Sequence, residues 1–387
     1  MNTHLRRVLL AVLVLAVVGP APAEAPPSSK KIIAAVQPFV EQSVLAGAVM
    51  LVADKDKVLS LDTVGYADVG AKKAMPADAL FWIASQSKPI TATALMMLVD
   101  EGRVSLDDPV EKYLPEFKGQ WLAVYRDADS LLLRKPKQRM TVRHILSHTS
   151  GMPFQSEMEK PTLDGLPLRD AVRSYALTPL QTEPGTKYQY SNAGINTAGR
   201  IIEVVSGMSY EDFLQQRLFD PLGMKDTTFW PSEKQLARLA KSYRPNKDKT
   251  GLEETTVGQL RYPLSDHSKR YPMPAGGLFS TAQDVGRFCR MILNGGTLDG
   301  KRYLSEEAVK QMTSKQTGDA LKDQYGLGWS TGGNIGHGGA HATGMSIDPK
   351  RGLIYVWMVQ HAGFPGDGNK SQGAFRKAAE AEFGGGK

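Results

Sequence analysis

Ser85 and Lys88 place a hydroxyl and an amine three residues apart at the predicted start of a helix. The run Ala79 to Ala84 in front of them is apolar, and Pro89 is typical of a first helical turn. Residues i and i+3 share one helix face, so the two side chains can meet. A lysine that burial keeps neutral can take the serine proton, which would make Ser85 a nucleophile. The same spacing occurs in the polar segment Ser28–Lys31 without an apolar run before it, so the pattern is informative only in its context.

The segment Tyr190-Ser-Asn192 follows a turn, Glu183 to Thr186, and precedes a predicted helix. A phenol near a lysine can relay a proton, and an amide can orient that lysine or a substrate carbonyl. Tyr190 would then be catalytic and Asn192 substrate-binding. The alternative is a core tyrosine followed by an asparagine that caps the helix, and taken alone these residues favour the alternative.

A glycine-rich segment, Gly336-His-Gly-Gly-Ala340, precedes a predicted strand. Consecutive glycines permit a ligand to approach the backbone closely, so His337, Gly338 and Gly339 are candidates for substrate binding. The amide of Ala340 could pair with the amide of Ser85 as an oxyanion hole. A flexible hairpin explains the glycines equally well, and His337 either faces the substrate or simply belongs to that hairpin.

Other kinds of site have little support in the sequence. No Gly-x-Ser-x-Gly motif of the usual α/β-hydrolases occurs. His144 and His148 lie four residues apart but lack the glutamate of a zinc motif, so we expect structural roles for both. Cys289 is the only cysteine and lies in a helix with apolar periodicity, which favours a core position. We therefore expect no metal site.

Residues 1–23 have the pattern of a secretory signal peptide, with Arg6 and Arg7, an apolar run, and the small-residue site Ala21-Pro-Ala23. The apolar run, Val8 to Val18, is shorter than the roughly 20 residues that span a bilayer. We therefore expect an exported protein, periplasmic or secreted, without a membrane span. The formal charge is +7, and lysines and arginines do not alternate with aromatic residues, so nucleic acid is not an expected partner.

Strand patterns lie near both ends of the chain, and helical patterns dominate between them. This order predicts a discontinuous α/β domain of residues 24–84 plus 310–387, with a mainly helical domain of residues 85–309 inserted into it. Two polar segments are expected to be irregular surface excursions, Asp127–Lys137 and Arg244–Tyr271. The expected strands are 47–52, 58–64, 326–329, 344–347 and 353–360, and the expected terminal helices are 31–44 and 372–383.

Three elements in this order, Ser85-x-x-Lys88, Tyr190-x-Asn192 and His337-Gly-Gly339, resemble the serine β-lactamase/penicillin-binding protein superfamily. Within it the chain is most similar to class C β-lactamases, DD-peptidases and, nearest, the family VIII carboxylesterases. The resemblance implies an antiparallel sheet in the α/β domain, as in the β-lactamase/transpeptidase fold. It also implies an acyl-enzyme on Ser85, with Lys88 and Tyr190 sharing the proton, Asn192 orienting the acyl group, and no cofactor.

The third element departs from the lysine-threonine-glycine form of most β-lactamases. His337 is mostly neutral at neutral pH where that lysine is charged, and Gly338 lacks the threonine hydroxyl. Both changes weaken recognition of a carboxylate, so we expect hydrolysis of carboxylic esters with weak or no β-lactamase activity. The alternatives are a D-stereospecific peptidase, DD-carboxypeptidase or class C-type β-lactamase, and a β-lactam- or peptidoglycan-binding protein without turnover. The expected partner is a small ester or amide, and contact with the cell wall is left open.

Overall fold

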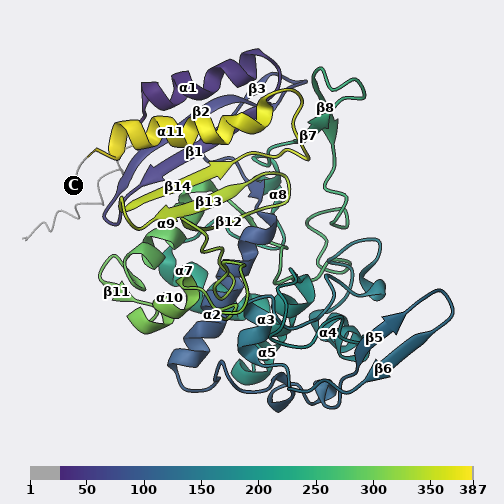
Figure 1. Cartoon of the computed structure of the whole chain (residues 1–387). Helices are drawn as coiled ribbons and strands as arrows, with labels where there is room; N and C mark the ends of the chain where they lie inside the picture. Colours follow the sequence, from purple (N-terminus) through teal and green to yellow (C-terminus); the bar gives the residue numbers. More distant parts are fainter. Residues whose placement is uncertain (1–26, 386–387) are drawn as a thin grey trace, which may run out of the picture.

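One antiparallel sheet joins the two ends of the chain in this computed structural model, which describes residues 27–385 (Figure 1). The strand order is β12-β13-β14-β1-β2-β3, and β1 pairs with both β14 and β2. The strands are β1 Gly47–Ala53, β2 Val58–Asp68, β3 Lys73–Ala74, β12 Ile335–Gly338, β13 Gly344–Asp348 and β14 Leu353–Met358. The predicted discontinuous α/β fold is therefore confirmed.

Helices cover both faces of this sheet. On one face lie α1 (Lys30–Glu41) and α11 (Ser371–Phe383), which also contact each other. On the other face lies α9 (Ala282–Leu293), which contacts β1, β13 and β14. Every residue of β1 and β14 is buried, as expected for central strands covered on both sides. The helix α9 thus packs on the sheet although the sequence analysis assigns it to the helical segment.

The helical part is built around α2 (Ser87–Asp100), whose residues 87–98 are all buried. Its main neighbour is α5 (Asn192–Ser206), which also contacts α3 (Val142–Leu146) and α4 (Leu168–Leu177). Most residues of α2 are apolar, and its buried polar side chains, such as Lys88 and Thr91, have hydrogen-bond partners, which suits a helix in a core. The remaining helices and turns are η1 Ala84–Gln86, η2 Val110–Lys112, η3 Pro115–Phe117, η4 Glu157–Glu159, α6 Tyr210–Leu214, η5 Gln215–Phe219, α7 Asp220–Leu222, α8 Glu233–Leu236, α10 Glu306–Thr313 and η6 Gly368–Lys370.

Small two-stranded sheets complete the structure. They pair β4 (Phe81–Trp82) with β9 (Phe279–Ser280), β5 (Leu122–Arg126) with β6 (Leu131–Arg134), β7 (Ser242–Pro245) with β8 (Leu252–Thr255), and β10 (Thr297–Leu298) with β11 (Lys301–Arg302). The β5–β6 and β7–β8 hairpins extend into the two segments that we expected to be irregular, so that expectation is wrong for 131–134, 244–245 and 252–255. Short runs of only four residues gave too weak a periodic signal to reveal these strands.

The expected strand at 326–329 is also absent. The amide of Gly326 donates to the carbonyl of Trp329, which closes a turn, and Gly328 has φ +74°, outside the range of a strand.

Cys289 is fully buried, as expected. The predicted signal peptide lies outside the described residues. Among residues 27–385, no helix combines the length and apolarity that crossing a membrane requires.

Candidate active site

Ser85 lies where a short strand turns sharply into the central helix. The strand β4 ends at Trp82, η1 follows, and α2 begins at Ser87. Ala84, directly before the serine, has φ +45°, a left-handed conformation that costs a residue with a Cβ atom roughly 1–2 kcal/mol. Such strain is found mainly where a side chain must be presented in a fixed position. Ser85 is half-buried at the positive end of the helix dipole, which favours developing negative charge.

Lys88 reaches the serine from one turn further along this helix and is fully buried. Its Nζ lies 3.0 Å from Ser85 Oγ, 2.8 Å from Asn192 Oδ1 and 2.8 Å from the carbonyl oxygen of Ala275. Burial lowers the pKa of Lys88 well below its ordinary value. A neutral amine has two N–H donors and one lone pair. Because Asn192 Oδ1 and the Ala275 carbonyl can only accept, the lone pair of a neutral Lys88 must face Ser85.

Tyr190 is the third candidate catalytic residue, and its ring lies next to Lys88. Lys88 Nζ is 4.7 Å from the centre of the Tyr190 ring. Burial raises the pKa of Tyr190 well above its ordinary value, while a hydrogen bond with Ser85 acts in the opposite direction. The resting side chain is therefore a neutral phenol, able to give a proton. The N-cap of α5 is Ser191, which accepts from the amide of Gly194, so Asn192 does not serve as the cap and its side chain is free to bind Lys88.

His337 lies on β12, the edge strand of the sheet, and begins a chain of hydrogen bonds that passes beside Tyr190. His337 Nδ1 is 2.6 Å from the carbonyl oxygen of Gly338, and its Nε2 is 3.0 Å from the hydroxyl of Tyr325. That hydroxyl is 3.2 Å from His148 Nε2, and the amide of Ser191 donates to His148 Nδ1 over 3.2 Å. The His148 and Tyr190 rings have centroids 4.4 Å apart.

Backbone groups at both ends fix the direction of every hydrogen bond in this chain. The Ser191 amide can only donate, so His148 Nδ1 accepts and its Nε2 carries the proton. The Gly338 carbonyl can only accept, so His337 Nδ1 donates and its Nε2 accepts from Tyr325. Burial is the main cause that lowers the pKa of His337 to about 3. Burial likewise lowers the pKa of His148 well below its usual range, so both imidazoles are neutral.

The end of β12 lies directly against the turn that carries the serine. A Cβ atom on Gly339 would lie 2.5 Å from the carbonyl oxygen of Ile83, so only glycine permits this approach. Ala340 packs against a hydrophobic cluster whose members include Trp82 and Ala84. Its amide donates no hydrogen bond to any residue between 27 and 385. The structure thus brings the candidate oxyanion donor next to the nucleophile turn, where an unpartnered amide suits a transient anion.

A cleft of about 300 Å³ opens beside Tyr190. Neither lysine nor arginine is among its lining residues, which are Tyr188, Tyr190, Asp323, Gln324, Tyr325, Ser330, His337 and Gly338. A Cβ atom on Gly338 would have only the Thr343 carbonyl oxygen within 4 Å, at 3.8 Å, so this glycine leaves the space above β12 open. A second depression, of about 470 Å³, shares His337 and Gly338 and is also lined by Gln372 and Arg376 of α11.

The structure brings together all the residues that the sequence proposed for catalysis and for holding Lys88, and places the segment His337–Ala340 beside them. His148 and Tyr325 were missed. The sequence analysis expected His148 to be structural, and its contacts with Tyr190 and Tyr325 place it within the site. Tyr325 carried no signal, because it directly precedes the glycine turn that we had interpreted as a strand. His144 has the expected structural role, since it caps α3 together with Thr141.

Comparisons with known proteins agree with this geometry. The family model described as Beta-lactamase matches residues 32–379. The protein Rv1367c of Mycobacterium tuberculosis is 31% identical over 364 residues, which cover 85% of this chain and 89% of that protein. A putative D-alanyl-D-alanine carboxypeptidase of Salmonella agona is 28% identical over 314 residues, 72% of this chain and 68% of that protein.

Among solved structures, EstCE1, a hydrolase with promiscuous acyltransferase activity, superposes with a TM-score of 0.75. The match covers 90% of this chain and 97% of EstCE1 at 23% sequence identity, which establishes a shared fold. The family model and the M. tuberculosis relative span most of the chain, and Lys88 Nζ contacts both the hydroxyl of Ser85 and the ring of Tyr190. The chain is therefore a serine hydrolase that belongs to the beta-lactamase family.

Proposed function

We propose that this protein is an exported hydrolase of carboxylic esters that acts through an acyl-enzyme on Ser85. Export rests on the signal-peptide pattern of residues 1–23. The observation that carries the choice of esters is the absence of lysine and arginine from the lining of the cleft beside Tyr190. Its only charged lining residue is Asp323, and His337 is neutral. A substrate carboxylate would meet no cation there and would be repelled by Asp323, whereas a neutral ester meets neither problem.

The first half of the reaction follows from the partners of Lys88. Its lone pair takes the proton of Ser85 while Oγ forms a bond to the ester carbonyl carbon. The amides of Ser85 and Ala340 hold the negative oxygen that results. The carbon–oxygen bond to the alcohol then breaks, and the alkoxide takes a proton from the hydroxyl of Tyr190, which is restored from Lys88. The products of this half are the free alcohol and acyl-Ser85.

Water completes the cycle. It attacks the acyl carbonyl and loses a proton to the Tyr190–Lys88 pair, and Ser85 leaves as the hydroxyl after taking a proton from Lys88. Asn192 holds Lys88 in place through its 2.8 Å contact in both halves. No step requires a cofactor or a metal.

A second candidate function is a D-stereospecific peptidase or a β-lactamase that acts on carboxylate-bearing substrates. It is favoured by the second depression, where Arg376 is the one lining cation. Arg376 Nε donates to Glu380 over 2.8 Å, so its charge is already partly compensated. The similarity to the putative carboxypeptidase of S. agona also supports this candidate. We rank it second because nothing in the cleft next to Tyr190 compensates a carboxylate.

Intact mass after brief exposure to a fluorophosphonate tests the nucleophile. Attack by Ser85 forms an oxygen–phosphorus bond and releases fluoride, so we expect one adduct on the native protein and none on Ser85→Ala. An adduct that persists in Ser85→Ala would place the nucleophile elsewhere. No adduct on the native protein would overturn the hydrolase mechanism.

The substrate class is then tested with p-nitrophenyl butyrate beside a chromogenic cephalosporin and a D-alanyl-D-alanine peptide. Turnover of the ester with little cleavage of the other two supports the proposal. Faster cleavage of the peptide or the cephalosporin would establish the second candidate. A single stoichiometric burst without turnover would indicate a binding protein.

A further inference from the structure

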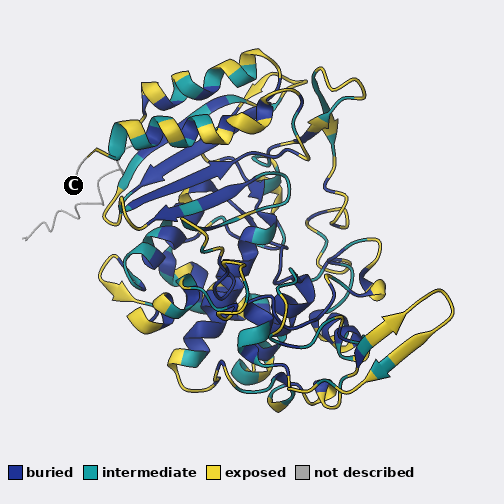
Figure 2. Cartoon of the chain, in the orientation of Figure 1, coloured by how far each residue is buried: buried dark blue, intermediate teal, exposed yellow. Residues whose placement is uncertain are grey.

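The β5–β6 hairpin stands out from the rest of the helical part (Figure 1). At its root, the amide of Ala123 donates to the carbonyl of Leu180, and Leu122 forms a bridge with the same residue. Beyond the root most of its residues are exposed, in contrast to the strands of the main sheet (Figure 2). An isolated two-stranded hairpin has no apolar face packed on a core. Large hydrophobic side chains on such a hairpin therefore need an explanation other than core packing.

The hairpin exposes an unusual share of large hydrophobic side chains. Within residues 27–385, twelve such side chains are exposed, and five of them lie between positions 121 and 132. They are Trp121 (47% exposed), Val124, Tyr125 (55%), Leu131 and Leu132 (60%). Single exposed hydrophobic residues are normal, but a cluster of this kind marks a surface that another body covers.

Positive charge is concentrated on the same segment. Residues 118–139, which we call the basic hairpin surface, contain six lysines and arginines against two aspartates, a net +4 of the chain's +7. Asp127 is used internally, since it accepts from the amides of Asp129 and Ser130 and from the hydroxyl of Tyr125. The six cations are Lys118, Arg126, Arg134, Lys135, Lys137 and Arg139.

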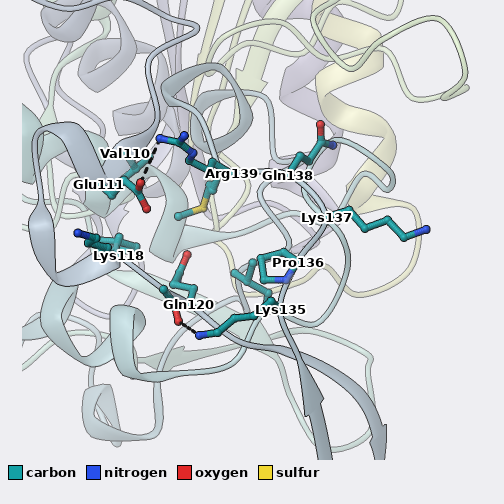
Figure 3. A pocket seen from close by; sticks show the side chains of 13 residues that line it. Val110, Glu111, Lys118, Gln120, Lys135, Pro136, Lys137, Gln138 and Arg139 are labelled. Carbon is teal, nitrogen blue, oxygen red and sulfur yellow. Dashed lines mark hydrogen bonds and ion pairs between the residues drawn. The ribbon is translucent and has the colours of Figure 1, made fainter.

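A cavity of about 330 Å³ opens at the root of the hairpin (Figure 3). Buried Val110, Phe117, Met140 and Leu180 contribute to its lining, together with four of the six cations. In Figure 3, Lys137 extends away from the cavity, while Gln120 lies between Lys118 and Lys135. The Nε2 atom of Gln120 is buried without a hydrogen-bond acceptor among the described residues.

Several cations of this surface are not neutralised by the protein. Arg139 pairs with Glu111 and Arg134 with Glu183, and Lys135 lies 3.5 Å above the ring of Trp121. The side chains of Lys118, Arg126 and Lys137 have no acidic partner within residues 27–385. Unpaired cations, exposed aromatic rings and an unsatisfied amide together fit a ligand that offers both phosphate and hydrocarbon.

We propose that the basic hairpin surface is a docking site for an anionic phospholipid bilayer. Trp121, Tyr125 and the two leucines would enter the headgroup region, and the cations would face the lipid phosphates. The cavity beside Lys118 and Gln120 would accept one phosphate. A second copy of the chain is the poorer occupant, because it would bring a second set of the unpaired cations Lys118, Arg126 and Lys137 against the first. This proposal does not depend on the proposed ester hydrolysis.

The single exposed tryptophan provides a direct probe. All five tryptophans lie in the described residues, and only Trp121 is exposed, while Trp230 is half-buried and the other three are buried. We expect vesicles of equal parts phosphatidylglycerol and phosphatidylcholine to shift the tryptophan emission to the blue and to protect it from acrylamide. Vesicles of phosphatidylcholine alone should do neither, and Trp121→Phe should abolish the signal.

Charge variants test the source of the affinity. The triple variant Lys118→Gln, Arg126→Gln and Lys137→Gln should weaken co-sedimentation with the anionic vesicles by about tenfold or more. A matched triple variant, Lys57→Gln, Lys225→Gln and Lys350→Gln, removes the same charge from exposed positions elsewhere and should bind as the native protein does. Thermal unfolding of both variants shows that each is folded.

Three results would overturn the proposal. Equal loss of binding in both triple variants would show that net charge alone attracts the vesicles. Absence of binding to anionic vesicles would remove the site. Light scattering that shows a dimer, lost in Leu131→Ser with Leu132→Ser, would assign the hairpin to a second copy instead.

Discussion

Titratable groups on the two sides of Tyr190, Lys88 on one and His337 on the other, have different hydrogen-bond partners. On one side Lys88 meets Ser85, Asn192 and a backbone carbonyl, of which two can only accept. On the other side His337 gives its proton to the Gly338 carbonyl and accepts from Tyr325. Burial lowers the pKa in both cases, so desolvation alone does not distinguish the two sides.

The partners decide what each side can do. A neutral Lys88 keeps its lone pair directed at Ser85, so it can take a proton and return it. Both ring nitrogens of His337 are occupied, so the ring can neither take a proton from the substrate nor offer one without breaking the chain. The Lys88 side, which we call the first side, therefore moves protons. The His337 side, the second side, forms a fixed and uncharged part of the cleft lining.

Removing the amine from the first side should give the largest effect. We expect Lys88→Met to lower kcat/KM for p-nitrophenyl butyrate by about 1,000-fold, since general-base catalysis contributes roughly 10²–10⁴-fold. Because burial lowers the pKa of Lys88, the native rate should rise with pH as the amine loses its proton and level off well below pH 10.5, the ordinary lysine value. The residual rate of the variant should lack this rise.

The control for this change is Lys73→Met, at an exposed lysine whose Nζ donates to the Ala237 carbonyl and contacts none of the site residues. It should retain native kinetics. A loss of less than tenfold in Lys88→Met would show that another group takes the serine proton.

Removing one hydroxyl from the second side should give a smaller effect. Tyr325→Phe leaves His337 Nε2 without a donor and His148 Nε2 without an acceptor. An unsatisfied buried polar group costs roughly 1–3 kcal/mol, so we expect kcat/KM to fall about tenfold. Nitrogen-15 NMR of labelled histidines should place the His337 proton on Nδ1 in the native protein and show a different tautomer population in the variant.

Tyr188→Phe is the matched control, because Tyr188 lines the same cleft and its hydroxyl forms no hydrogen bond with residues 27–385. It should leave the histidine resonances unchanged. A native His337 protonated on Nε2, or equal spectra for both variants, would contradict the hydrogen-bond directions derived above.

The contrast between the two sides also explains which residues the sequence could reveal. Ser85 and Lys88 interact across a single helical turn, and the i, i+3 spacing is visible in any sequence. His148 and Tyr325 are 177 positions apart, and only the packing of the helical part against the glycine turn at 326–329 brings them together. No local period encodes such a contact.

The same distinction holds for the fold. The central strand β14 is a continuous apolar run and the helix α1 has an amphipathic period, and both were predicted close to their observed bounds. The β6 strand has only four residues, and two of its three leucines are exposed, whereas an apolar run predicts a buried strand. Under our proposal these side chains contact a lipid surface, and no periodic pattern within the chain encodes such a partner.

Giving the second side a charge is the smallest and most selective change. His337→Lys breaks the link to Tyr325 and places an ammonium in a cleft whose only charged lining residue is Asp323. We expect the preference for mono-p-nitrophenyl succinate over p-nitrophenyl butyrate, two esters that differ mainly by a carboxylate, to rise by about fivefold. This corresponds to about 1 kcal/mol, the upper range for a solvent-exposed ion pair. His337→Gln, which changes the side chain without adding charge, should leave that ratio unaltered. If the ratio also stays constant in His337→Lys, charge at this position does not select the substrate. His337 would then affect substrate choice only through the shape of the cleft.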